Sequence, residues 1–203
     1  MKKNAITFLL ASVFVIAGAF VAGIARSSEG EVPAPPAIGA TVEDFSLTDA
    51  DDIQQSLSSL KGKNGAVLIF VATKCPVSNA YNERMEKLAQ DFKARGVNVI
   101  GINANAKETG AEVKAHAAQN NLTFAVLKDP ANKIADRLGA TVTPEAYFLD
   151  ANNKLVYRGR IDNAKEAAQV NSSELRDAIE ATLDGKPVAK TTATAFGCSI
   201  KRA

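Results

Sequence analysis

The chain has 203 residues, of which 46% are hydrophobic and 23% charged, as in an ordinary globular domain, and this composition excludes a wholly disordered protein. The net charge of +2 comes from Lys2 and Lys3, because residues 26–203 contain 22 basic and 22 acidic side chains. Such a balance argues against nucleic acid as a partner. With two cysteines, a single His116 and no phosphate-binding glycine motif, we expect neither a metal nor a cofactor.

Residues 1–25 have the three parts of a secretory signal. Lys2 and Lys3 form a basic start, residues 5–25 carry no charge, and Gly23-Ile24-Ala25 ends with the small residues that suit cleavage. The uncharged run is also long enough to span a bilayer, so we consider both a cleaved signal peptide and an uncleaved membrane anchor. Both predict an exported protein in a periplasmic or other extracytoplasmic compartment, where disulfides form.

Residues 26–40 contain Pro33, Pro35 and Pro36 among small side chains, which predicts an extended linker. We therefore expect the folded domain to span residues 41–184. Helical periodicity is lost after Gly185, and we interpret residues 185–203 as a C-terminal tail.

The expected domain alternates between strand and helix patterns. The apolar, branched run at 66–72 is typical of a strand buried on both faces, whereas Tyr81, Met85, Leu88 and Phe92 recur at helical spacing. We predict strands at 44–47, 66–72, 97–102, 124–127, 146–149 and 154–158, and helices over 81–92, 109–120, 130–138 and 171–183. This order predicts an α/β domain with a mixed sheet covered by helices on both faces.

The third predicted helix has the clearest end signals. Asp129 is placed as its N-cap, Pro130 as its first residue and Gly139 as its end. We therefore interpret Asp129 as a helix cap and not as a catalytic acid.

Cys75 is the strongest candidate for a reactive side chain. It follows the buried strand and stands with Pro76 at the expected start of a long helix, where unpaired N–H groups and the helix dipole stabilise a thiolate. Lys74 adds a positive charge beside it. The alternative is that Cys75 is a small buried residue at a strand end.

Five segments follow one another in a recognisable order: 44–47, 57–63, 73–76, Thr143-Pro144 and 155–162. In this order and spacing they resemble the thioredoxin-like superfamily, specifically its redoxin and peroxiredoxin-like branch, named for alkyl hydroperoxide reductase and thiol-specific antioxidant. The resemblance covers about residues 38–184. It implies a thioredoxin-like fold in which Cys75 is the attacking thiol.

The resemblance also implies a substrate-binding site beside Cys75. Thr143-Pro144 matches a loop whose proline is cis and packs beside the cysteine. Thr73 is a further candidate, although it stands one position away from the threonine with which peroxiredoxins hold peroxide. Arg160 is a candidate because an arginine near a thiolate lowers its pKa; the alternative for Arg160 is a solvated strand edge.

Two departures from the family patterns limit the function. Ser78 stands where a CxxC protein has its second cysteine, which excludes a self-contained dithiol motif. Leu68 and Ala72 occupy the proline and threonine positions of the peroxiredoxin PxxxTxxC pattern, so peroxidase activity is in doubt.

Cys198 lies in a tail that resembles the ending of peroxiredoxin-like proteins with a lone cysteine in a Gly-Cys-x-Ile-Lys context. The 13 residues from Gly185 to Cys198 span roughly 43 to 47 Å when extended, so Cys198 can reach Cys75. A sulfenic acid on Cys75 could then condense with Cys198 to a disulfide. Cys198 is therefore either a resolving cysteine or one half of a permanent structural disulfide.

Together these observations predict an exported thiol-dependent oxidoreductase of the redoxin type. Its expected partners are a peroxide or protein disulfide as substrate and a thiol protein as reductant, with possible membrane anchoring through residues 5–25. The alternative is a non-catalytic redoxin-fold binding module in which Cys75 and Cys198 are merely joined.

Overall fold

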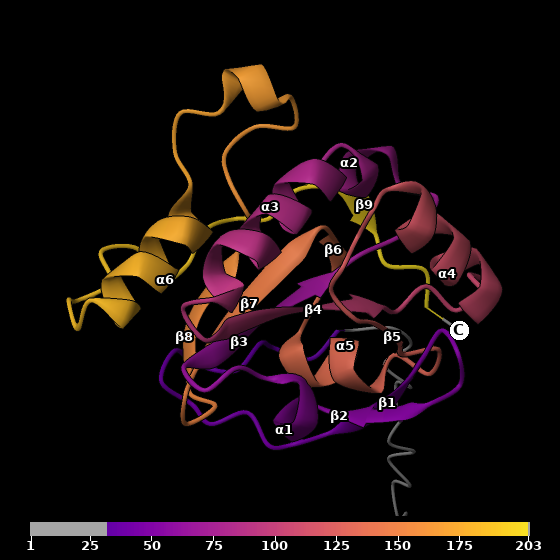
Figure 1. Cartoon of the computed structure of the whole chain (residues 1–203), viewed down its shortest axis with the longest axis horizontal. Coiled ribbons are helices and arrows are strands. Elements are labelled where there is room, and N and C mark those ends of the chain that lie inside the picture. Colours follow the sequence, from indigo (N-terminus) through magenta and orange to yellow (C-terminus); the bar gives the residue numbers. More distant parts are fainter. Residues whose placement is uncertain (1–31, 203) are drawn as a thin grey trace, which may run out of the picture. The chain divides into compact units, whose positions relative to one another are not determined.

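The computed structural model describes residues 32–202 (Figure 1). The predicted signal or anchor at 1–25 and residues 26–31 of the predicted linker lie outside the described residues. Within residues 32–202, no helix combines the length and the apolar character that crossing a bilayer requires.

The core of the domain is a mixed seven-stranded sheet, in the order β2-β1-β5-β4-β3-β7-β8. Its strands are β1 (Ser46–Asp49), β2 (Gln54–Ser56), β3 (Gly65–Phe70), β4 (Val97–Asn103), β5 (Val126–Lys128), β7 (Glu145–Asp150) and β8 (Leu155–Gly159). β3 and β4 run parallel, since Asn64 N–H donates to the Gly96 carbonyl at one end and Val71 N–H donates to the Ile102 carbonyl at the other. A separate antiparallel pair joins β6 (Val142–Thr143) to β9 (Cys198–Ser199).

Helices cover both faces of the sheet, as predicted (Figure 1). They are α1 (Leu57–Leu60), α2 (Pro76–Asn79), α3 (Asn82–Lys93), α4 (Gly110–Gln119), α5 (Lys133–Leu138), the short 3₁₀ helix η1 (Ala167–Gln169) and α6 (Glu174–Leu183). Alternation along β3 explains the two layers. Val67 and Ile69 pack against α3 and α6, whereas Leu68 and Phe70 pack against α1 and α5.

Most element boundaries differ from the prediction by one to three residues, and three of them show the kind of difference. The first strand spans 46–49 instead of 44–47, the strand before Asp129 spans 126–128 instead of 124–127, and the last helix begins at Glu174 instead of Asn171. Each difference is a few residues at an element end, where local sequence signals are weakest.

The helix after Asp129 begins at Lys133, so the predicted start at Pro130 is wrong. Residue Asn132 is the N-cap and adopts a left-handed conformation (φ 57°). Asp129 nevertheless caps the helix from a distance, because its carboxylate accepts the N–H groups of Ile134 and Ala135, each at 2.9 Å. Because the chain turns at 130–132, the carboxylate of Asp129 lies at the first turn of the helix although Asp129 precedes that turn by several residues.

Both flanking segments pack on the sheet. Before Thr41, Gly39 N–H donates to the Leu155 carbonyl at 2.8 Å. In the tail, Arg158 N–H donates to the Thr191 carbonyl and Ala193 N–H donates to the Arg158 carbonyl, both at 3.1 Å. Residues 191–193 therefore run alongside β8 and lead the chain toward β9.

Candidate active site

Cys75 lies at the end of the loop that follows the buried strand β3. It is the N-cap of α2, and its Sγ accepts the N–H of Ser78 at 3.2 Å. Cys75 is only 3% exposed to solvent. The expectation that Cys75 starts a long helix is wrong. The helix that it caps, α2, has four residues, and the helical conformation is interrupted before α3 begins. Stabilisation of a Cys75 thiolate therefore depends on local N–H donors more than on a long helix dipole.

The Thr143-Pro144 peptide bond is cis, as the family resemblance implied. Cys75 Sγ lies 3.4 Å from the carbonyl oxygen of Thr143, which confirms that this loop packs beside the cysteine. The substrate-binding roles of Thr143 and Pro144 remain predictions.

A disulfide joins Cys75 to Cys198 across 123 residues of sequence, with their Cα atoms 5.9 Å apart. The tail brings Cys198 there as strand β9, in which Cys198 stands opposite Thr143. Beyond it, Ile200 is 6% exposed and its N–H donates to the Thr141 carbonyl at 2.9 Å. Cys198 itself is half-buried, so it is the more accessible cysteine of the pair.

A buried carboxylate, Glu108, organises the loop before Cys75. It accepts the backbone N–H groups of Thr73 at 2.8 Å and Lys74 at 3.2 Å. It also accepts the side-chain amides of Asn103 at 2.6 Å and Asn105 at 3.0 Å. Burial opposes its charged form, but the Thr73 N–H and the other donors outweigh burial, so the pKa of Glu108 lies below its ordinary value.

Lys128 provides the buried positive charge of the same network. Its Nζ donates to the side-chain oxygen of Asn103 and to the backbone carbonyls of Asn105 and Glu108. Burial lowers its pKa, while the charge of Glu108 raises it, and burial prevails. The network reaches the tail, since Asn105 Oδ1 accepts the Lys201 N–H at 2.7 Å.

Sequence reasoning missed Glu108 and Lys128 as members of the site. The available signal was the amides of Asn103, the last residue of a buried strand, and Asn105, followed by Glu108 just before the N-cap of a helix. Polar residues at the carboxyl end of a buried strand commonly serve the functional edge of an α/β sheet.

Other predicted site residues have different surroundings. The guanidinium of Arg160 forms an ion pair with Glu174, with Nε donating to Oε2 at 3.2 Å. Thr73 has a buried hydroxyl without a hydrogen-bond partner. The ammonium group of Lys74, expected to favour a thiolate, is 2.6 Å from the carboxylate of Glu112, which compensates its charge. The substrate-binding roles of Arg160 and Thr73 remain predictions.

His116 is separate from both cysteines. Its Nε2 lies 3.0 Å from Asn79 Oδ1 and 3.3 Å from Asn82 Nδ2, so it connects α4 to the start of α3. Burial lowers its pKa, which favours the neutral ring.

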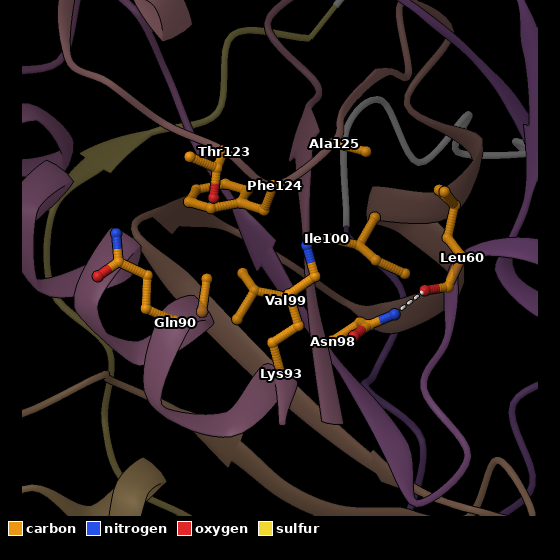
Figure 2. Close-up of a pocket in the computed structure, with 10 residues that line it drawn as sticks. Leu60, Gln90, Lys93, Asn98, Val99, Ile100, Thr123, Phe124 and Ala125 are labelled. Carbon is orange, nitrogen blue, oxygen red and sulfur yellow. Dashed lines mark hydrogen bonds between the residues drawn. The ribbon is translucent and has the colours of Figure 1, made fainter. Parts of the chain in front are cut away.

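A cavity of about 290 Å³ opens beside the disulfide, and Cys75, Cys198 and Glu108 are among its lining residues. A larger cavity of about 500 Å³ lies at the opposite end of the sheet, near the start of β4 (Figure 2). Figure 2 shows Phe124, Val99 and Ile100 around this larger cavity, together with the hydrogen bond from Asn98 to the Leu60 carbonyl. The residues that line the larger cavity include no cysteine and no carboxylate. The smaller cavity, which is lined by both cysteines of the disulfide, is therefore the candidate active-site cavity.

Comparison with known protein families agrees with the placement of Cys75 beside the cis-proline loop. A family model described as the AhpC/TSA family matches residues 38–158. The chain belongs to this family. The membership confirms the predicted redoxin resemblance, and the thioredoxin-like fold that it implied is confirmed as well.

Similar proteins cover most of the chain. Thiol-disulfide oxidoreductase ResA of Bacillus cereus is 27% identical over 169 residues, which span 82% of this chain and 94% of that protein. Chloroplastic peroxiredoxin Q of Sedum lineare is 31% identical over 140 residues, spanning 63% of this chain and 72% of that protein. The crystal structure of a hypothetical protein from Sinorhizobium meliloti superposes with a TM-score of 0.77 at 30% identity, covering 84% of this chain and 97% of that one. The family and the disulfide together support a thiol-dependent oxidoreductase of the redoxin type.

Proposed function

We propose that the protein is a redoxin-type thiol–disulfide oxidoreductase that uses Cys75 and Cys198 as its redox-active pair. The disulfide between these residues, at the N-cap of α2 and beside a cis-proline loop, is the observation that carries the proposal. The similar protein named thiol-disulfide oxidoreductase ResA supports it. The pair replaces the CxxC motif that Ser78 removes, because the tail delivers the second cysteine from 123 residues away.

Exchange from the oxidised state begins at Cys198. A partner thiolate attacks the sulfur of Cys198, because Cys198 is partly exposed whereas Cys75 is only 3% exposed. The Cys75–Cys198 bond breaks, a mixed disulfide forms between the partner and Cys198, and Cys75 leaves with the electron pair as a thiolate. The Ser78 N–H, which already points at Cys75 Sγ, stabilises this leaving group.

A second partner thiolate completes the reaction. It attacks the partner's own sulfur in the mixed disulfide, so that Cys198 leaves as a thiolate and is protonated. Two electrons pass from the partner dithiol to the protein, and the partner gains the disulfide. A substrate disulfide oxidises the reduced protein again. The Cys75 thiolate attacks one substrate sulfur, and the other substrate sulfur leaves as a thiolate. Cys198 then attacks Cys75, which releases the first substrate sulfur and re-forms the Cys75–Cys198 disulfide.

Peroxide reduction is a second candidate. The similarity to peroxiredoxin Q supports it, and Thr73 provides a buried hydroxyl without a hydrogen-bond partner two residues before Cys75. Here the Cys75 thiolate attacks one peroxide oxygen, water or an alcohol leaves, and Cys198 condenses with the sulfenic acid to release water. Leu68 and Ala72 lie where peroxiredoxins have proline and threonine, which makes disulfide exchange the better supported function.

We also propose that the protein is exported. The basic, uncharged and small-residue parts of residues 1–25 support an export signal, and a disulfide suits an oxidising compartment. A protein disulfide or dithiol in that compartment is the proposed substrate, and a thiol protein is the proposed reductant. Cell fractionation with antibody detection tests the location; a wholly cytoplasmic pool of full-length chain contradicts it.

A redox titration tests the main proposal. The folded protein is equilibrated with dithiothreitol mixtures of defined potential, quenched with acid, alkylated and analysed by mass spectrometry. We expect the Cys75–Cys198 pair to equilibrate under native conditions and to catalyse reduction of insulin disulfides by dithiothreitol. A disulfide that stays intact in excess reductant until the protein unfolds would establish the structural alternative instead.

A further inference from the structure

The cavity beside the disulfide has a positively charged rim. Its lining includes Lys74, Lys107 and Lys201, together with the sulfur-bearing residue Cys198. The lysines come from three separate segments: the loop before α2, the loop before α4 and the tail. They surround the cysteine that an incoming thiolate meets first.

The carboxylates near the cavity do not neutralise the positive charge of this rim. Glu108, which also lines the cavity, is 5% exposed and is held by four protein N–H donors, with Lys128 in the same buried network. Glu112 pairs with Lys74. Within residues 32–202, these pairings leave Lys107 and Lys201 as lining cations without an ion pair.

Lys107 and Lys201 are accessible to a ligand that approaches the cavity from solvent. Lys107 and Lys201 are exposed, and the ammonium group of Lys201 lies 2.9 Å from the hydroxyl of its neighbour Ser199. The segments that carry them are held together, because Ala106 N–H donates to the Lys201 carbonyl at 2.9 Å and Lys201 N–H donates to Asn105 Oδ1 at 2.7 Å. The tail and the loop before α4 are therefore joined at the cavity, with one lysine on each.

The size of the cavity limits what enters it. Its volume of about 290 Å³ is just below the range for small-molecule sites, which begins at about 300 Å³. Such a space accommodates a small thiol, or a cysteine with an adjacent side chain on a partner protein.

Resting on the proposed disulfide exchange, we infer that the thiol that reduces Cys75–Cys198 carries carboxylate groups next to its sulfur. Lys107 and Lys201 attract these carboxylates and so bring the thiolate to Cys198. The shared chemistry is a carboxylate-flanked thiol, supplied either by a small molecule or by an acidic segment around a partner's cysteine.

Reduction kinetics test the inference. The rate of disulfide reduction is measured with mercaptosuccinate, with neutral 2-mercaptoethanol and with cationic cysteamine, each corrected for its own thiolate fraction. Two hexapeptides with one cysteine, flanked by either glutamate or glutamine, form the second arm. In Lys107→Ala/Lys201→Ala, we expect the rate ratio of mercaptosuccinate to 2-mercaptoethanol to fall about fivefold from its wild-type value, and the ratio for cysteamine to rise. Comparing the variant with wild type cancels the intrinsic reactivity of each thiol.

A matched control separates local from general charge effects. Lys63→Ala/Lys154→Ala removes the same charge near the opposite end of β3 and should leave the ratios at their wild-type values. The effect should also weaken as salt rises from 0.01 to 1 M, roughly as screening shortens from about 30 Å to about 3 Å. The arm that shows the fivefold change identifies the source, a small thiol or an acidic peptide.

The outcomes distinguish this inference from the proposed function. Normal reduction by 2-mercaptoethanol, with equal ratios in wild type and Lys107→Ala/Lys201→Ala in both arms, would overturn the inference and leave the exchange function intact. A disulfide inert to every thiol would overturn the exchange function and the inference together.

Discussion

The carboxylate of Glu108 accepts the backbone N–H of Thr73 at 2.8 Å, although the two residues lie on different loops. This contact, with the neighbouring bond from Lys74 N–H, fixes the backbone two residues before the reactive Cys75. The geometry of the redox site therefore depends on a residue that does not touch either sulfur.

Replacing Glu108 should loosen this loop. We expect Glu108→Ala to lower the free energy of unfolding by about 1–3 kcal/mol, since it leaves two buried side-chain amides and two partly buried backbone N–H groups unpaired. The wild-type contribution is present above pH 4.5 and is lost as the pH falls through the depressed pKa of Glu108. Urea titrations at pH 7 and at lower pH measure both effects.

A matched control is Glu112→Ala, which removes an exposed carboxylate from the next helix. Its ion pair with Lys74 is solvent-exposed, and its other contact is the capping of α4 at the Thr109 N–H, so we expect a clearly smaller loss of unfolding free energy than in Glu108→Ala. Equal losses in the two variants would contradict a special role for Glu108.

The two cysteines should differ in which one receives the incoming thiol. We expect oxidised protein that is treated briefly with 2-mercaptoethanol and quenched with acid to carry the adduct mainly on Cys198, because Cys75 is only 3% exposed. Peptide mapping by mass spectrometry locates the adduct. Cys75→Ser and Cys198→Ser, each converted fully to its mixed disulfide, provide the reference masses and retention times.

An excess of adduct on Cys75 would contradict this order of attack. It would mean that the tail leaves its place before the disulfide is cleaved.

The ion pair of Arg160 with Glu174 should control stability at low pH. The hydrogen bond from Arg160, acting against burial, lowers the pKa of Glu174 from 4.5 to about 2. Its contribution is therefore full above pH 4.5 and declines as the pH falls toward 2. We expect Arg160→Met to cost on the order of 3 kcal/mol at pH 7 and to flatten this pH dependence, because the buried carboxylate of Glu174 keeps only the distant Lys190, at 3.8 Å, as a counter-charge.

The double variant Arg160→Met/Glu174→Leu separates stability from chemistry. Replacing both charges with apolar side chains should restore most of the unfolding free energy at pH 7. If Arg160 also acts on the substrate, the rate of disulfide exchange stays low in the double variant. A restored rate would assign Arg160 to the structure alone.

The sequence predicted the site best where the information is local. A continuous apolar run predicted β3, and the family pattern around Thr143-Pro144 predicted the cis bond beside Cys75. The break between α2 and α3 was missed because the helical spacing that begins at Tyr81 lies wholly on the α3 side of it and carries no sign of the break. Periodicity shows which face of a helix is buried, but it does not show where the backbone leaves the helical path.

Contacts between distant segments could not be read in the same way. The sequence showed that the tail could reach Cys75, but not that Ile200 is buried beyond Cys198 and helps to hold the tail in place. The pairing of Glu108 with the loop before Cys75 requires two loops to meet in space. The polar residues around Glu108 indicate a functional edge of the sheet, but they do not show which loop its carboxylate contacts.

Gly197 should be essential for placing Cys198. A Cβ atom at this position would collide with the carbonyl oxygen and carbon of Thr143, both backbone atoms in the strand that pairs with β9. We therefore expect Gly197→Ala to push the tail away from β6 and to slow formation of the Cys75–Cys198 disulfide in the reduced, refolded protein. Alkylation of quenched samples during air oxidation or exchange with oxidised glutathione gives the rate of disulfide formation.

The control is Gly185→Ala, at the other end of the tail. Gly185 also has a positive φ (68°), but a Cβ atom there meets nothing within 4 Å. It should cost about 1 kcal/mol through backbone strain while Cys198 still reaches Cys75 at the wild-type rate. Because both variants add one methyl group to a glycine of the tail, only the approach to Thr143 distinguishes them. Equal rates of disulfide formation in Gly197→Ala and Gly185→Ala would show that close pairing of β9 with β6 is not what brings the two cysteines together.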